Sequence, residues 1–126
     1  MTDALINVDS VLIWGLKQAT GVEVYPIQAE EGASAPYVVY NRISDRLQDR
    51  TQTTGGATHL GRFQITHVAT SFAGLRTLVS AVQGYLENNQ TDFSASLTDD
   101  LHIEDKEDEN IFTAVKDFFI QWKSSI

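Results

Sequence analysis

The residues best suited to chemistry in this chain are its three histidines, His59, His67 and His102. A metal site would need two of them, or one with carboxylates, at short helical or alternate-strand spacing. His59 and His67 would lie roughly 26 Å apart along one strand, which is too far to share an ion. We therefore interpret His67 as a half-buried strand histidine that fills space.

An acidic stretch near the C-terminal end is a second candidate, because hard cations such as Ca²⁺ prefer several carboxylates. Its members are Asp99, Asp100, Glu104, Asp105, Glu107, Asp108 and Glu109. No window in the stretch supplies the glycine that an EF-hand loop needs at its sixth position. We interpret it as a solvated acidic turn, with a partner-binding acidic surface as the alternative.

Motifs of nucleophilic catalysis and nucleotide binding are absent from the sequence. No serine lies in a Gly-x-Ser-x-Gly elbow, and neither phosphate-binding glycine pattern occurs. The chain has no cysteine, which excludes a thiolate nucleophile, a disulfide and a Cys-ligated zinc. We predict a protein that is not an enzyme and holds no cofactor or metal. The enzymatic alternative is a small metal-dependent enzyme that uses His67 or His102 with nearby carboxylates.

The amino-acid composition is typical of a globular protein. The 126 residues, 42% hydrophobic and 21% charged, are typical of one globular domain. The formal charge of −8 disfavours a surface that neutralises nucleic-acid phosphates. No apolar run approaches the roughly 20 residues that span a bilayer, and the N-terminus lacks a secretory signal pattern. We expect synthesis in the cytoplasm and no membrane contact.

Two amphipathic segments predict the helices that would position these residues. Apolar residues at helical spacing predict a first helix, begun by Thr2 or Asp3 and ended by Gly21. These residues are Leu5, Val8, Leu12, Leu16 and Ala19. A second apolar stripe follows Ser71, a good N-cap, and ends at Asn88-Asn89. That stripe holds Phe72, Leu75, Leu78, Val79, Val82, Tyr85 and Leu86.

The remaining segments predict strands. Val22 to Pro26 is typical of a short strand, and Pro36 of the entrance to a central strand that starts at Tyr37. A returning strand from about Leu60 to Thr70 would place Phe63, Ile65, His67 and Ala69 on one face. The two form a long β-hairpin arm whose Thr/Gly-rich tip, about 48–58, we expect to be mobile.

Two further strands complete the predicted fold. One lies between Phe93 and Ile103, and the last from Ile111 to Trp122. The order α-β-β-β-α-β-β predicts a single α+β domain over residues 1–126. In it, a mostly antiparallel sheet of four to five strands packs against two helices.

Arginines crowd the predicted hairpin arm. Arg42, Arg46 and Arg50 fall on one face whether the segment is a strand or a helix. Asp45 and Asp49 could neutralise them in a solvated arm; alternatively, the arm reaches the acidic stretch of a neighbouring copy. Such a head-to-tail contact closes into a ring. The interface candidates are Arg42, Arg46, Arg50, Arg62, Asp100, Glu104, Asp105, Glu107, Asp108 and Glu109.

Several blocks of sequence together resemble the phage tail completion (tail terminator) family. The first runs from Val24-Tyr25-Pro26 through Glu31-Gly32-Ala33-Ser34-Ala35-Pro36-Tyr37-Val38-Val39-Tyr40-Asn41-Arg42-Ile43-Ser44. The second is Phe63-Gln64-Ile65 with Ala69-Thr70-Ser71-Phe72-Ala73, and the third is Asp117-Phe118-Phe119-Ile120-Gln121-Trp122. The resemblance covers the chain from about Val22 to its C-terminus.

The resemblance implies a structural protein of the virion tail, without catalytic residues. It implies a hexameric ring of identical subunits on the last ring of the major tail tube protein, where it stops tube growth and offers a surface to the head-tail connector. DNA would pass through the ring without specific binding, although the arginine arm could instead point inward at the DNA. The alternative is a monomeric adaptor or neck component that bridges head and tail.

Overall fold

The structure is a computed structural model that describes residues 8–50, 56–88, 93–97, 102–106 and 111–125. Two helices and six strands are described in these ranges, and they confirm the predicted α+β class. In chain order they are α1 (Val8–Thr20), β1 (Glu23–Pro26), β2 (Tyr37–Arg50), β3 (Gly56–Ala69), α2 (Phe72–Asn88), β4 (Phe93–Leu97), β5 (His102–Lys106) and β6 (Ile111–Ser125). Neither described helix is long and apolar enough to cross a membrane.

Helix α1 ends where the sequence predicts. Gly21 has a φ of 73°, which favours glycine, and its backbone N–H donates to the Lys17 carbonyl at 2.8 Å. Val8, Leu12 and Leu16 are buried, as their helical spacing requires. The predicted N-caps Thr2 and Asp3 lie outside the described residues.

Helix α2 begins at the predicted N-cap. The Ser71 hydroxyl accepts a hydrogen bond from the Gly74 backbone N–H at 2.9 Å, which satisfies one of the free donors of the first turn. Five residues of the predicted apolar stripe are buried: Leu75, Leu78, Val79, Val82 and Leu86. Phe72 departs from the stripe because it lies in the first turn, half exposed, with its ring edge-on to Phe112.

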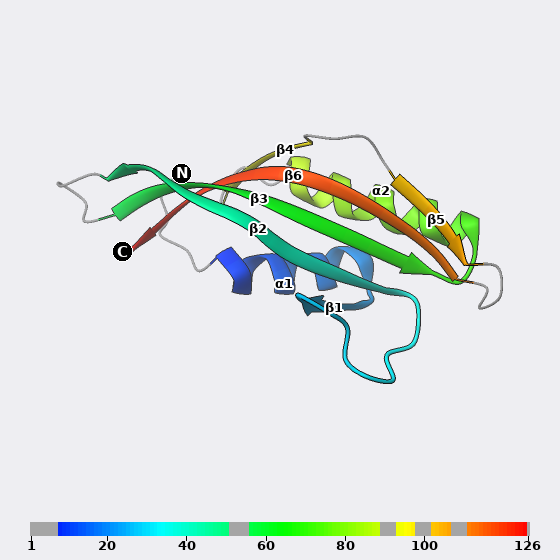
Figure 1. Cartoon of the computed structure of the whole chain (residues 1–126). Coiled ribbons are helices and arrows are strands. Elements are labelled where there is room, and N and C mark those ends of the chain that lie inside the picture. The colour runs from blue at the N-terminus through cyan, green and yellow to red at the C-terminus, as the bar shows by residue number, and fades with distance from the viewer. Residues whose placement is uncertain (1–7, 51–55, 89–92, 98–101, 107–110, 126) are drawn as a thin grey trace.

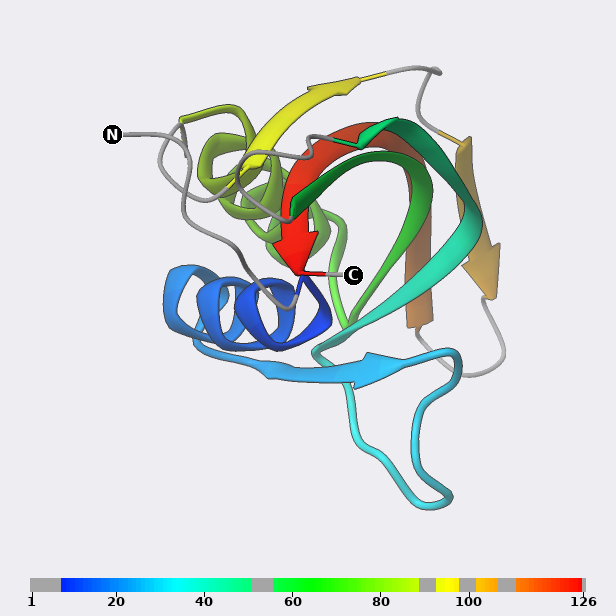
Figure 2. The same ribbon diagram turned by 90° about the vertical axis from the view of Figure 1, so that its left-hand side faces the viewer.

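The sheet has the strand order β1-β2-β3-β6-β4, with β5 also paired to β6. The β1–β2 pair is parallel and the other pairs are antiparallel. Figures 1 and 2 show the sheet strongly curved, with both helices on the same side of it. The opposite side carries no helix among the described residues, so the molecule has two layers.

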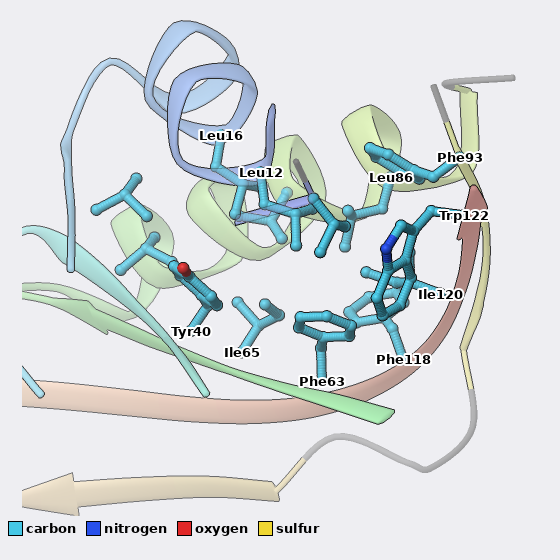
Figure 3. Close-up of a cluster of buried hydrophobic side chains, with 14 of the residues drawn as sticks. Leu12, Leu16, Tyr40, Phe63, Ile65, Leu86, Phe93, Phe118, Ile120 and Trp122 are labelled. Atoms are coloured by element: carbon cyan, nitrogen blue, oxygen red, sulfur yellow. The ribbon is translucent and has the colours of Figure 1, made fainter. Parts of the chain in front are cut away.

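The main core lies between the helices and the covered side of the sheet. Figure 3 shows Leu12 and Leu16 of α1 and Leu86 of α2 facing the strand residues below them. Phe63, Ile65, Phe118 and Ile120 are completely buried in this cluster. Their every-second-residue spacing places them on the side of β3 and β6 that meets the helices, whereas Phe119, between two of them, is exposed.

The segment expected to hold one strand between Phe93 and Ile103 forms two. Strand β4 lies opposite Phe118–Trp122 and β5 lies opposite Ile111–Val115, so both follow the same edge of β6. The sheet therefore has one strand more than the predicted upper number. Glu104 and Asp105 lie in β5, so the prediction of a turn was wrong for them; unpaired polar edge groups of β6 favour pairing there despite their low strand propensity.

The predicted hairpin forms, but it is not a free two-stranded arm. Strands β2 and β3 each have 14 residues, and β6 pairs with β3 along its whole length, from Gly56 opposite Ser125 to Ala69 opposite Phe112. In Figure 1 the ends of β2, β3 and β6 extend together beyond α1. Residues 51–55 of the predicted mobile tip lie outside the described residues.

Candidate functional site

The first arginine of the predicted series is held within its own chain. Arg42 lies opposite Phe63 on the side of the sheet that faces the helices. Its Nη2 donates to Asp9 Oδ2 of α1 at 2.7 Å, in an ion pair that is partly exposed. The guanidinium carbon also lies 5.6 Å from the centre of the Phe63 ring and 5.4 Å from that of Trp122. Arg42 therefore joins strand β2 to helix α1 through charge and cation–π contacts.

Aromatic rings pack beside this arginine, partway along the hairpin. His59 stacks on Trp122, with ring centres 5.1 Å apart and planes 8° from parallel. Phe63 packs edge-on against the same tryptophan at 5.8 Å. The Tyr40 hydroxyl donates to Asp9 Oδ1 at 3.2 Å. Burial, together with the neighbouring Asp9 carboxylate, raises the pKa of Tyr40 to about 12.

The prediction that Arg42, Arg46 and Arg50 share one face was wrong. The register is shifted between Arg42 and Ser44 and again between Leu47 and Asp49, so each interval holds one residue without a partner on β3. Each such bulge reverses the alternation of the strand. Arg42 and Arg50 lie opposite Phe63 and Ala57, whereas Arg46 lies opposite Leu60 on the other alternation of β3.

Arg62 lies on the side of the sheet away from the helices and also has a partner in its own chain. Its Nε and Nη2 donate to Oδ2 of Asp117 on β6, at 3.0 and 2.5 Å. Asp117 is buried, one of two buried polar residues among those described, and the pair neutralises it. Sequence reasoning missed both Asp9 and Asp117 as partners, since each is far along the chain from its arginine and carries no local signal.

The acidic stretch is described only in part. Glu104 and Asp105 lie in β5, opposite Thr113 and Phe112. Asp100, Glu107, Asp108 and Glu109 lie outside the described residues. The predicted contact between the arginines and this stretch on a neighbouring copy is therefore untested.

His67 is fully buried rather than half-buried, because α2 covers this end of the sheet and Ala114 lies directly opposite on β6. Its Nδ1–H donates to the Ala114 carbonyl oxygen at 2.9 Å, and Nε2 has no hydrogen-bond partner among the described residues. Burial, with a smaller contribution from the nearby Lys116 ammonium, lowers the pKa of His67 to about 4. The imidazole is thus neutral and structural at physiological pH.

Metal and ligand binding have little support in the described part of the chain. It holds no cluster of three or more histidine or carboxylate side chains that could bind an ion. An open hollow of about 550 Å³ lies on the outer side of α2, lined there by Ala73, Arg76, Thr77, Ser80 and Ala81. All five residues come from one helix and Arg76 is the only one with a long side chain, so they supply no set of converging groups for catalysis.

Comparison with known proteins finds a likeness in structure only. No protein-family model matches the chain, and no curated protein matches it in sequence. Among solved structures, it is similar to a chain in the virion of the native gene transfer agent (GTA) particle, with a TM-score of 0.55 and 16% identity. The match covers 86% of this chain and 84% of that one. The two chains therefore share a fold over most of their length.

Proposed function

We propose that this chain is a structural subunit of a phage-like virion, in which it forms a ring that caps the tail tube. In this role it ends tube polymerisation and presents a surface to which the head is joined. The observation that carries the proposal is the fold shared with a chain of the GTA virion, over 86% of the present chain. A subunit of this kind performs no catalysis and needs no cofactor.

The sequence blocks that resemble tail terminators support the more specific role. They fall on β1 and β2, on the junction of β3 with α2, and on β6. Strands β1, β2, β3 and β6 are successive neighbours in the sheet, so blocks far apart in sequence come together in one part of the fold. This arrangement is expected if the resemblance reflects a common structural unit rather than chance similarity of single strands.

Charge supports a ring around a DNA passage. The chain carries a formal charge of −8, and in the described residues Arg42 and Arg62 are engaged by Asp9 and Asp117. An acidic lining with neutralised arginines binds phosphate weakly, which lets DNA move through without being retained. The partners of this proposal are other copies of the chain, the tube protein and a head-tail connector.

One observation favours a monomeric adaptor between head and tail as the second candidate. Arg42 and Arg62 both form ion pairs inside their own chain, so neither depends on a neighbouring copy for a carboxylate. An adaptor would stay monomeric until it met a different protein. It would also bind assembled tails without changing the length of growing tubes.

Tube capping can be tested directly. Purified chain is added to polymerising tail-tube protein, and tube lengths are measured by electron microscopy. The ring proposal expects shorter tubes as the chain concentration rises, with extra density at one tube end. A small acidic protein of similar charge is the control. Unchanged tube lengths and bare tube ends would contradict capping.

A further inference from the structure

One side of the sheet carries no helix among the described residues, and uncharged residues from four strands form one part of it. Opposed residues from β1, β2, β3 and β6 form a row on this side: Tyr25, Val39, Thr66 and Val115. The adjacent row continues with Tyr37, Val68 and Thr113. We call the surface made by Tyr25, Tyr37, Val39, Thr66, Thr113 and Val115 the open sheet face. These six side chains are partly exposed, and the Tyr25 and Tyr37 rings pack edge-on at 5.8 Å.

Two ion pairs within the chain lie near the open sheet face, and Glu104 of β5 borders it opposite Thr113. Further along the same side of β3 and β6, Arg62 is paired with Asp117. At the β1 edge, Oε1 of Glu23 lies 3.2 Å from Nζ of Lys17 on α1. Tyrosines, β-branched residues and few free charges are the composition of the centre of a protein interface, not of an ordinary solvated surface.

The opposite side of the molecule carries an exposed tryptophan. Trp14 of α1 is 68% exposed, pointing away from the core that holds Leu12 and Leu16. On the outer side of α2, Thr77, Ser80 and Ala81 are short, and the exposed Arg76 among them carries a positive charge. We call Trp14 with these four α2 residues the outer helix surface. A large exposed aromatic ring is a common anchor of interfaces, and short neighbours let a flat partner approach the helices closely.

We propose that the outer helix surface of one copy packs on the open sheet face of the next copy. Charge argues for a second copy as the occupant. Two chains of charge −8 repel one another wherever their acidic surfaces meet, so they can associate best through faces without net negative charge. The six residues of the open sheet face are uncharged, and Arg76 is the only charged residue of the outer helix surface. A basic partner would instead be drawn to the acidic surface.

The contact gives the sheet helices on both sides, its own and those of its neighbour. Because two different surfaces meet, the contact is head to tail, and repeating it with a closing rotation generates a ring. The inference rests on the proposed ring, and it names the surfaces that would build it. The arginine contacts expected from the sequence are not required.

Substitutions on the two surfaces test the proposal through self-association, measured by sedimentation equilibrium. Trp14→Ser on the helices and Thr66→Lys on the sheet should each raise the dissociation constant roughly tenfold or more. Gln28→Lys is the control, because it adds the same charge at an exposed position outside both surfaces; it should change the constant by about twofold at most. Circular dichroism checks that each variant is folded.

Cross-linking tests which surfaces meet. Because the chain has no cysteine, an introduced cysteine is the only thiol that can react. Thr66→Cys and Ser80→Cys are prepared separately and treated with a short bismaleimide. The proposal expects covalent dimers when the two variants are mixed, and none from either variant alone. Dimers of Ser80→Cys alone would show helices meeting helices and would overturn the proposal.

Different results would contradict the ring proposal and the proposed packing of helices on the open sheet face. If the wild-type chain assembles while Trp14→Ser and Thr66→Lys assemble equally well, the packing of helices on the open sheet face is wrong and the ring stands. If the wild-type chain stays monomeric at every concentration and no cross-linked dimer forms, both proposals fail.

Discussion

The Arg42 guanidinium donates to the Asp9 carboxylate over a separation of 33 residues, so an arginine expected at a subunit contact ties strand β2 to helix α1. The same guanidinium lies over the Phe63 and Trp122 rings. The middle of the hairpin is thus joined to α1 and β6 by contacts of Arg42, Phe63 and Trp122. These contacts lie within one subunit, so we expect Arg42 to stabilise the fold of the subunit itself.

Replacing Arg42 should destabilise the fold. Arg42→Met removes a partly exposed ion pair and two cation–π contacts, for an expected loss of about 1–2 kcal/mol in the free energy of unfolding. Lys17→Met is the matched control, because the Lys17–Glu23 pair is more exposed and no aromatic ring contacts Lys17 among the described residues; it should cost below about 0.5 kcal/mol. Urea denaturation measures both. Equal losses would contradict a structural role specific to Arg42.

Removing Arg62 should leave the buried Asp117 carboxylate without its ion-pair partner. Since the Arg62 side chain is itself 40% exposed, we expect a moderate cost for Arg62→Met, about 1–3 kcal/mol in urea denaturation. Asp117→Asn in the Arg62→Met background should recover part of the loss, because the amide buries no charge. A double variant as unstable as the sum of the two single variants would rule out coupling between the residues.

His67 should make the stability depend on pH in the acidic range. Its pKa is about 4 in the folded chain and the usual 6.5 when unfolded, so the unfolded state binds the proton first as pH falls. The contribution is fully present above pH 6.5 and is lost between 6.5 and 4, with a maximum of about 3 kcal/mol.

The control for this prediction is His67→Gln, which keeps an N–H donor for the Ala114 carbonyl but does not titrate. Urea denaturation is measured at a series of pH values for both proteins. The difference between them isolates His67 from the carboxylates that titrate in the same range. Parallel curves between pH 6.5 and 4 would refute the prediction.

Two glycines test the contact between the helices. A Cβ at Gly15 of α1 would lie 1.8 Å from the Tyr85 hydroxyl of α2, so Tyr85 would have to move. Gly15→Ala should therefore lower the free energy of unfolding by about 1–3 kcal/mol. A Cβ at Gly84 of α2 would meet nothing within 4 Å, and Gly84→Ala should raise stability by about 0.5–1 kcal/mol. Thermal unfolding compares the two, and a stabilised Gly15→Ala would contradict the close packing.

Local chemistry explains which parts of the fold were predictable. The ends of the helices depend on residues next to them, and Ser71 and Gly21 act as the sequence predicts. The long hairpin follows from alternation in two segments with a turn-like composition between them. The sequence did not predict that β4 and β5 both pair with the same edge of β6. Pairing with that available edge outweighed the low strand propensity of β5.

The candidate site was predictable in its residues but not in its geometry. One unpaired residue after Arg42 reverses the alternation, and where it falls depends on pairing with β3, which the sequence of β2 alone does not reveal. The Asp9 and Asp117 partners depend on the same tertiary arrangement. Trp14 appears in the sequence as one more apolar residue of a helix, and only the packing of α1 leaves it exposed.

The central claim is that this chain assembles with copies of itself, and the mass in solution tests it most directly. Multi-angle light scattering is measured over a range of protein and salt concentrations. The account predicts a mass that rises with concentration from the 14.0 kDa of one chain towards six times that value. Higher salt should favour assembly, because it screens repulsion between acidic copies. A mass of one chain under every condition would contradict the claim.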